Sequence, residues 1–84
     1  ALAKEIIPLI IQKIPSIENF KNDDIFSTMS EIATQKDIKT KTLFYVMRIA
    51  LTGLEVTPGG ATEIAEILGK DECINRLNLA LKSL

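Results

Sequence analysis

Apolar residues recur every three or four positions along almost the whole of this 84-residue chain, and this spacing constrains its fold more than any other feature. Such a period places apolar side chains on one face of an α-helix, whereas a half-buried strand needs alternation at every second position. No stretch shows sustained alternation. The pattern therefore predicts an all-α fold, a compact bundle of about five short helices around a modest core.

Two helices are expected in the first half of the chain. Pro8 either begins or kinks the first helix, and Pro15 ends it. The second helix should run from residue 24 to about residue 36, with Asp23 or Asp24 as its N-cap. The residues expected on the apolar faces of these helices are Ile6, Leu9, Ile10, Ile14, Ile17, Ile25, Phe26, Met29, Ile32 and Ala33.

A third helix, over about residues 40–52, should be the central, surrounded element of the bundle. It is apolar on all sides from Leu43 to Leu51 except at Arg48, and a helix of that composition is normally buried among other elements. Gly53 suits the left-handed position just beyond the end of a helix.

The segment TPGG, residues 57–60, predicts the start of a fourth helix, with Thr57 as N-cap and Pro58 as the first helical residue. Gly69 should end this helix, and a fifth helix should follow over about residues 71–82. The residues expected to be buried in these two helices are Ala61, Ile64, Ala65, Ile67, Leu68, Cys73, Ile74, Leu77, Ala80, Leu81 and Leu84.

Arg48 is the one charged residue in the central apolar run. A guanidinium stays charged at physiological pH, and leaving a buried one without a partner costs on the order of several kcal/mol. Either a carboxylate of the same chain, such as Glu55 or Glu31, or a ligand should therefore meet Arg48. The residues alone leave both alternatives open.

Charge is nearly balanced over the whole chain, with a formal net charge of -1, but it is locally uneven. Lys36, Lys39, Lys41 and Arg48 form a basic island in which only Asp37 is acidic. The overall balance argues against bulk electrostatic wrapping of nucleic acid but not against a local site. Taken alone, the island favours a solvated connector over a phosphate-binding patch.

The aromatic residues Phe26, Phe44 and Tyr45 are more typical of a core than of platforms on which bases stack. The apolar stretch IIPLII is far shorter than the roughly 20 residues that span a bilayer. We therefore expect the three aromatic residues to pack inside the domain. We also expect no membrane partner.

Residues suited to catalysis are scarce. Histidine is absent, which removes the commonest general base and the commonest metal ligand. The single Cys73 cannot form an internal disulfide or a zinc site, and no phosphate-binding loop motif is present. No catalytic residue, metal site or cofactor is therefore expected in the chain itself.

Three segments, LFYVMRIALTG, TPGG and EIAEILGKDECINRLNLAL, together resemble one protein family. Over about residues 39–84, their order, spacing and residue types are similar to the extreme C-terminal part of bacterial glutamyl-tRNA synthetases. The resemblance implies that residues 1–84 are the C-terminal part of an anticodon-binding domain within a larger enzyme. In that family this helical domain grips the anticodon of glutamate tRNA, while another domain handles ATP and glutamate.

The resemblance also implies which residues meet the anticodon. Arg48 would point toward it from the central helix, and Thr57 with Pro58 would form a corner facing the same place. Gly59 and Gly60 complete this corner, although many relatives carry a larger aliphatic residue where Gly60 stands.

Lys39 and Lys41 are expected to contact the RNA backbone. The resemblance implies a monomeric, cytoplasmic enzyme that attaches glutamate to its tRNA with ATP and magnesium, and to which this chain contributes no catalysis. The alternative is a helical protein-interaction module with Arg48 in a structural salt bridge. An exposed Arg48 beside these lysines and the corner, without a carboxylate partner, would favour RNA binding.

Overall fold

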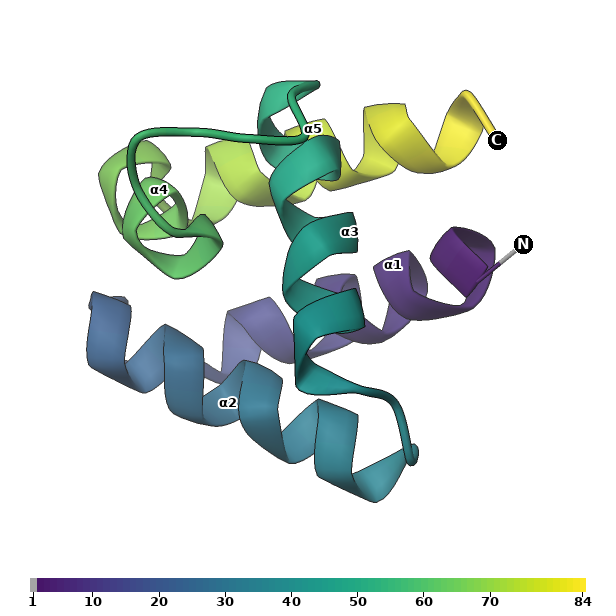
Figure 1. Ribbon diagram of the computed structural model, residues 1–84. Helices are drawn as coiled ribbons and strands as arrows, with labels where there is room; N and C mark the ends of the chain where they lie inside the picture. Colours follow the sequence, from purple (N-terminus) through teal and green to yellow (C-terminus); the bar gives the residue numbers. More distant parts are fainter. Residues whose placement is uncertain (1) are drawn as a thin grey trace.

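The computed structural model describes residues 2–84 and contains five α-helices and one short 3-10 helix, with no strand in that range (Figure 1). The predicted all-α bundle is therefore confirmed. The elements are α1 (Leu2–Lys13), η1 (Ile14–Ser16), α2 (Asn22–Gln35), α3 (Thr40–Thr52), α4 (Ala61–Leu68) and α5 (Lys70–Lys82).

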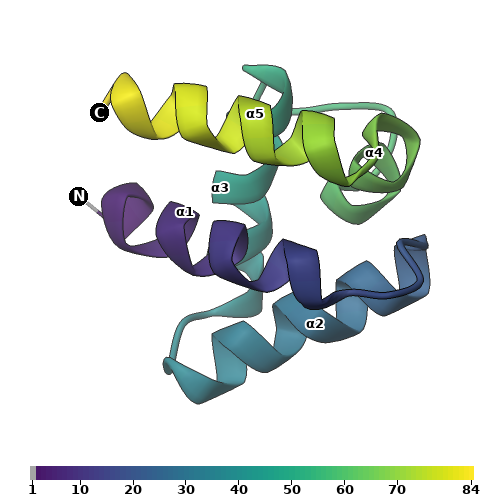
Figure 2. The same ribbon diagram turned by 180° about the vertical axis from the view of Figure 1, so that it is seen from behind.

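Helix α3 packs against all four of the other α-helices, which confirms its predicted central position. In Figure 1 it stands upright in front while α1, α2 and α5 run across the view, and Figure 2 shows the same crossing from behind. Helix α1 begins and α5 ends on the same side of the molecule.

The core receives one stripe of side chains from α3, formed by Leu43, Met47 and Leu51, each at most 2% exposed. These residues are four positions apart and so lie on one face of the helix. The buried apolar residues of the other elements are Ile6, Ile7, Ile10, Ile14, Ile17, Ile25, Met29, Ile32, Ala33, Ala61, Ala65, Cys73 and Leu77. Its apolar composition had suggested that α3 is buried on all sides. In the structure, α3 is fully buried on one face only.

The starts of the first two helices differ from the predictions in detail. Pro8 lies inside α1, so it does not begin the helix. Pro15 lies in the 3-10 turn that follows α1, as expected for a residue that ends a helix. Lys21 occupies the N-cap position of α2, so Asp23 and Asp24 lie in the first turn, where their charge meets the positive end of the helix.

The start of α4 also differs from the prediction. The helix begins directly after Gly60, so Thr57 is not its N-cap and Pro58 is not its first residue. The Thr57 hydroxyl instead donates to the carbonyl of Gly59 at 2.5 Å, closing a turn ahead of the helix. The Glu63 carboxylate accepts from the backbone N–H of Gly60 at 3.0 Å, which is the half of a capping box that the third helical residue supplies.

Ile67, predicted to be buried, is 84% exposed. Successive helical residues turn by about 100°, so Ile67 points almost directly away from the buried Ala65. The inner side of α4 also carries Thr62, whose hydroxyl donates to the side-chain oxygen of Asn22 at 2.6 Å and ties α4 to the start of α2. Leu84 is 48% exposed and likewise lies outside the core, contrary to the prediction.

Both glycines predicted to end helices do so. Gly53 and Gly69 have φ angles of 76° and 86°, a region that residues with a side chain rarely adopt. The end of α3 is further held by Arg76, whose Nη1 donates to the Leu51 carbonyl at 2.8 Å and whose Nε donates to Glu72 at 2.8 Å. A cation therefore meets the end of α3 at which carbonyls lack helical partners.

Replacing Leu51 or Leu77 by alanine should lower the free energy of unfolding by about 2–5 kcal/mol, because each change leaves a cavity in a small core. Ile67→Ala is the matched control and should change it by less than about 0.5 kcal/mol, because its side chain is exposed. Urea unfolding followed by circular dichroism measures the three changes. Equal losses in all three variants would contradict this assignment of helix faces.

Candidate functional site

One face of α3 is left open by its neighbours. Lys41, Phe44, Tyr45 and Arg48 follow one another at three- and four-residue spacing along the side away from the core stripe. Together with Thr42 they line an open cleft of about 570 Å³. This surface, named here the Arg48 cleft, combines two cations with two aromatic rings on a single helix.

Arg48 lines this cleft without a carboxylate partner. Its Nη1 lies 3.5 Å from the backbone carbonyl oxygen of Glu55, at the outer limit for a hydrogen bond. Its Nε is buried and has no hydrogen-bond partner within residues 2–84. The single ion pair in that range joins Arg76 to Glu72. A salt bridge from Arg48 to Glu55 or Glu31, one of the two alternatives considered from the sequence, is therefore not formed there.

The side chain of Glu55 is bound to Tyr45 instead. The Tyr45 hydroxyl donates to Glu55 Oε1 at 2.8 Å. This hydrogen bond is the main cause that raises the pKa of Tyr45 above its ordinary value of 10.0, and desolvation and the charge of Glu55 act in the same direction. Because Glu55 is held in this way, the guanidinium of Arg48 keeps most of its donors available to a ligand.

The TPGG corner follows α3 by a short loop. Glu55, whose carbonyl contacts Arg48, precedes Thr57 by two residues, but neither Thr57 nor Pro58 lines the Arg48 cleft. Figure 1 shows this loop leaving the upper end of α3 and curving over to α4. Pro58 is exposed and Thr57 is half-buried, with its hydroxyl hydrogen donated to Gly59. The corner therefore offers an apolar ring and an acceptor oxygen to solvent.

The two glycines of the corner have room for a side chain. Gly60 is extended, with φ -73° and ψ 162°, a conformation that any residue adopts. A Cβ at Gly60 would lie 3.3 Å from Glu63 Oε1, and one at Gly59 would lie 3.8 Å from Glu63 Cβ. A Cβ at Gly60 would therefore require only a small shift of the Glu63 carboxylate.

The basic island of the sequence is divided between different surfaces. Lys41 lines the same cleft as Arg48. Lys39 occupies the N-cap position of α3 and is exposed, but it is not part of the cleft lining. Lys36, just after α2, lines a separate pocket beside Lys13. The structure therefore brings two of the four cations together.

Phe26 and Tyr45 are exposed, contrary to the prediction, whereas Phe44 packs against the core. Phe26 is 50% exposed, Tyr45 is 42% exposed and Phe44 is half-buried. Phe26 of α2 stacks on Phe44 of α3, with ring centroids 5.0 Å apart and an interplanar angle of 20°. Ile25, which precedes Phe26 on α2, is fully buried, and the helical period alone contains no signal that separates these two neighbours.

The side chains most used in catalysis and metal binding do not gather in the described part of the chain. Within residues 2–84, no three His, Cys, Asp or Glu side chains converge on a common point. The Cys73 thiol is buried, and burial raises its pKa to about 11, so it is not a thiolate at neutral pH. Over the same residues, no helix is long and apolar enough to cross a bilayer.

A family model described as an anticodon binding domain matches residues 1–81. The glutamate–tRNA ligase of Clostridium acetobutylicum is 38% identical over 71 residues, which are 84% of this chain and 15% of that protein. Proteins of the same name from Clostridium tetani and Clostridium botulinum strain Hall are 35% and 31% identical, over 84% and 89% of this chain. The chain spans 14% and 16% of the length of those two relatives. No solved structure shows significant similarity to it.

Glu55→Ala should lower the pKa of Tyr45 toward its ordinary value of 10.0, because the substitution removes the hydrogen bond and the charge that raise it. Tyr45 is the only tyrosine of the chain and tryptophan is absent, so an ultraviolet absorbance titration follows this one group. Glu18→Ala removes an exposed carboxylate that does not contact Tyr45 and should leave the midpoint unchanged. A wild-type midpoint equal to that of Glu55→Ala would mean that the hydrogen bond is not formed.

Proposed function

The chain belongs to the anticodon-binding domain family, and from this premise we propose that residues 1–84 form the C-terminal part of the anticodon-binding domain of a glutamate–tRNA ligase. The three ligases that are 31–38% identical to it support this assignment. The domain would grip the anticodon loop of glutamate tRNA. The ligase would attach glutamate to that tRNA with ATP, and this domain would contribute binding and no catalysis.

The observation that carries the proposal is that the guanidinium of Arg48 has no carboxylate partner within residues 2–84. Its Nη1 has only the Glu55 carbonyl oxygen at 3.5 Å, at the outer limit for a hydrogen bond. Bases and phosphates are rich in acceptors, and the planar guanidinium can meet two of them at once. Lys41 adds a second cation in the same cleft. We assign base recognition to Arg48 and a backbone phosphate contact to Lys41.

The TPGG corner would meet a neighbouring base of the same loop. The exposed ring of Pro58 offers an apolar surface to an unstacked base, and the Thr57 oxygen can accept from its edge. Gly59 and Gly60 carry no side chain, so a base can approach their backbone closely. Lys39, exposed at the start of α3, would add a weaker phosphate contact.

A helical protein-interaction module is the alternative function. It depends on a structural salt bridge from Arg48, and no carboxylate of residues 2–84 forms one. The guanidinium instead has a carbonyl oxygen at 3.5 Å. The anticodon proposal is therefore the better supported of the two.

The proposal extends to the ligase as a whole. ATP and magnesium would be bound in a different part of that protein. Its partner would be glutamate tRNA, and it would work in the cytoplasm without contacting a membrane. One cleft suffices for one anticodon loop, so we propose that the domain acts as a monomer.

Arg48→Ala in the intact ligase should weaken productive use of glutamate tRNA by about 1–3 kcal/mol, roughly the value of one good bidentate base contact. Arg48→Lys should recover little, because an ammonium cannot reproduce the planar guanidinium. Both variants should keep the melting temperature of the wild type. The test is aminoacylation of wild-type and anticodon-substituted tRNA, combined with thermal melts.

Arg76, the other arginine of the chain, provides the matched control. It binds the Leu51 carbonyl at the end of α3, so Arg76→Ala should lower the melting temperature and leave the anticodon dependence unchanged. If Arg48→Ala gave that same pattern, a stability loss without anticodon dependence, the proposal would be wrong.

The isolated chain should bind RNA weakly and with a shallow salt dependence. Lys39 and Lys41 can neutralise about two phosphates, so the logarithm of the binding constant should fall with log salt at a slope of about -1.4. Titration of a labelled anticodon hairpin at several salt concentrations measures this slope. Tight, sequence-blind binding with a steep slope would instead indicate a general RNA-binding protein.

A further inference from the structure

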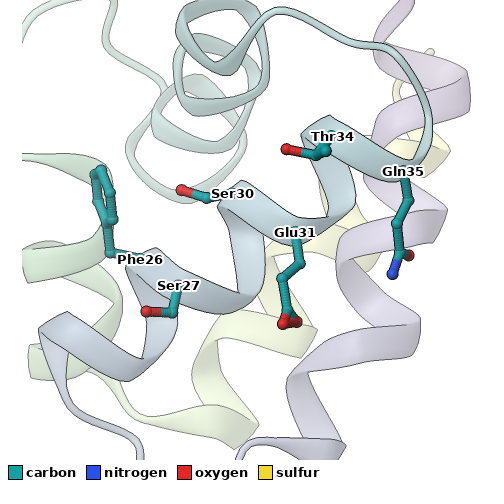
Figure 3. Close-up of a pocket in the computed structure, with 6 residues that line it drawn as sticks. All are labelled: Phe26, Ser27, Ser30, Glu31, Thr34 and Gln35. Carbon is teal, nitrogen blue, oxygen red and sulfur yellow. The ribbon is translucent and has the colours of Figure 1, made fainter.

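The stacked rings of Phe26 and Phe44 lie at the surface, between two open clefts. Phe44 lines the Arg48 cleft, and Phe26 lines a second cleft of about 550 Å³ along α2. The remaining residues that line this second cleft are Ser27, Ser30, Glu31, Thr34 and Gln35 (Figure 3). A single exposed phenylalanine is ordinary in a small protein, but this ring pair forms the boundary that both clefts share.

The helical period sorts the side chains of the second cleft into two rows. Phe26, Ser30 and Thr34 are four residues apart, and Figure 3 shows them on one side of α2. Glu31 and Gln35 point to the other side in the same view. Hydroxyl groups therefore follow the exposed ring along α2, while Glu31 lines the same cleft from the neighbouring row.

An exposed ring followed by hydroxyls suits an unpaired nucleotide. A base can stack on the ring, and the hydroxyls can donate to or accept from its edge or the ribose 2′-hydroxyl. Phe26 is 50% exposed, and Phe44 supports it from below at a centroid distance of 5.0 Å. The ring pair is therefore a platform built from two helices, which holds the outer ring in place before a base arrives.

We propose that Phe26, supported by Phe44, stacks a second unpaired base of the RNA loop whose neighbouring base is read by Arg48. This inference rests on the proposed function and extends its site from α3 onto α2. The strand would pass from the Arg48 cleft, with Lys41 at a phosphate, over the ring pair to Ser30. Phe26 lies outside residues 39–84, which contain the motifs that resemble the synthetase family.

The composition of the two clefts favours RNA over a protein partner. The two clefts place aromatic rings beside hydroxyls and two cations, groups that a base, a ribose and a phosphate can contact, and the second cleft also contains the carboxylate of Glu31. Stacking tolerates any base, because every base presents a π-face. The platform should therefore add affinity without sequence preference, and discrimination should remain with Arg48.

Two substitutions of Phe26 test the platform. Phe26→Leu removes the ring and keeps an apolar side chain, and it should weaken binding of an RNA hairpin carrying the glutamate anticodon loop by at least about fivefold. The factor should be the same for an anticodon-swapped hairpin. Phe26→Trp keeps a ring and introduces the only tryptophan of the chain, so affinity should be retained and RNA should quench its emission.

Leu79→Ala is the control, because Leu79 is 55% exposed on α5, outside both clefts, and should not affect binding. Wild-type affinity in Phe26→Leu, or unquenched emission in Phe26→Trp at saturating RNA, would overturn the platform. If Phe26→Leu also lowered the melting temperature, its weaker binding could reflect lost stability. Quenching of the tryptophan emission in Phe26→Trp would then show whether RNA contacts this position. If the proposed function were wrong, Arg48→Ala would leave the preference for the glutamate anticodon unchanged. A wild-type chain that bound neither hairpin would overturn both proposals.

Discussion

The burial of one face of α3 determines where the other parts of the molecule lie. Leu43, Met47 and Leu51 fill the space between four helices, and each is worth about 1.5–3 kcal/mol when buried. Because residues four apart share a helix face, this burial turns Lys41 and Arg48 away from the core. Core and candidate site therefore occupy different faces of a single helix, and a change that rotated α3 would disturb both.

The two arginines show how their surroundings assign different roles to one residue type. Arg76 donates to the Leu51 carbonyl at 2.8 Å, so its charge is used inside the fold. Arg48 has only a carbonyl oxygen at 3.5 Å, because Tyr45 holds the carboxylate of Glu55. The hydrogen bond of an exposed tyrosine thus keeps a guanidinium available, and the raised pKa of Tyr45 is the measurable sign of that arrangement.

Part of the candidate site can be predicted from the residues and part cannot. Arg48 and Lys41 stand out as charges on an otherwise apolar helix, and the structure places them in one cleft. Their contacts with RNA stay a prediction. Phe26 could not be found in this way, because the helical period shows which residues share a face but not how much of that face a neighbour covers. On α2 the neighbouring helices cover Ile25 completely but leave half of the next residue, Phe26, exposed.

Local sequence suffices for the all-α class, the central position of α3 and the helix ends at Gly53 and Gly69. The class depends on the apolar period over three or four residues, the helix ends on the absence of a Cβ, and the central position on the apolar composition of α3. Packing between helices determines the start of α4, the exposure of Ile67 and the contacts of Arg48. In each case the local pattern is compatible with more than one helix face or hydrogen-bond partner. The positions of residues that are distant in the chain determine which face is buried and which partner is bound.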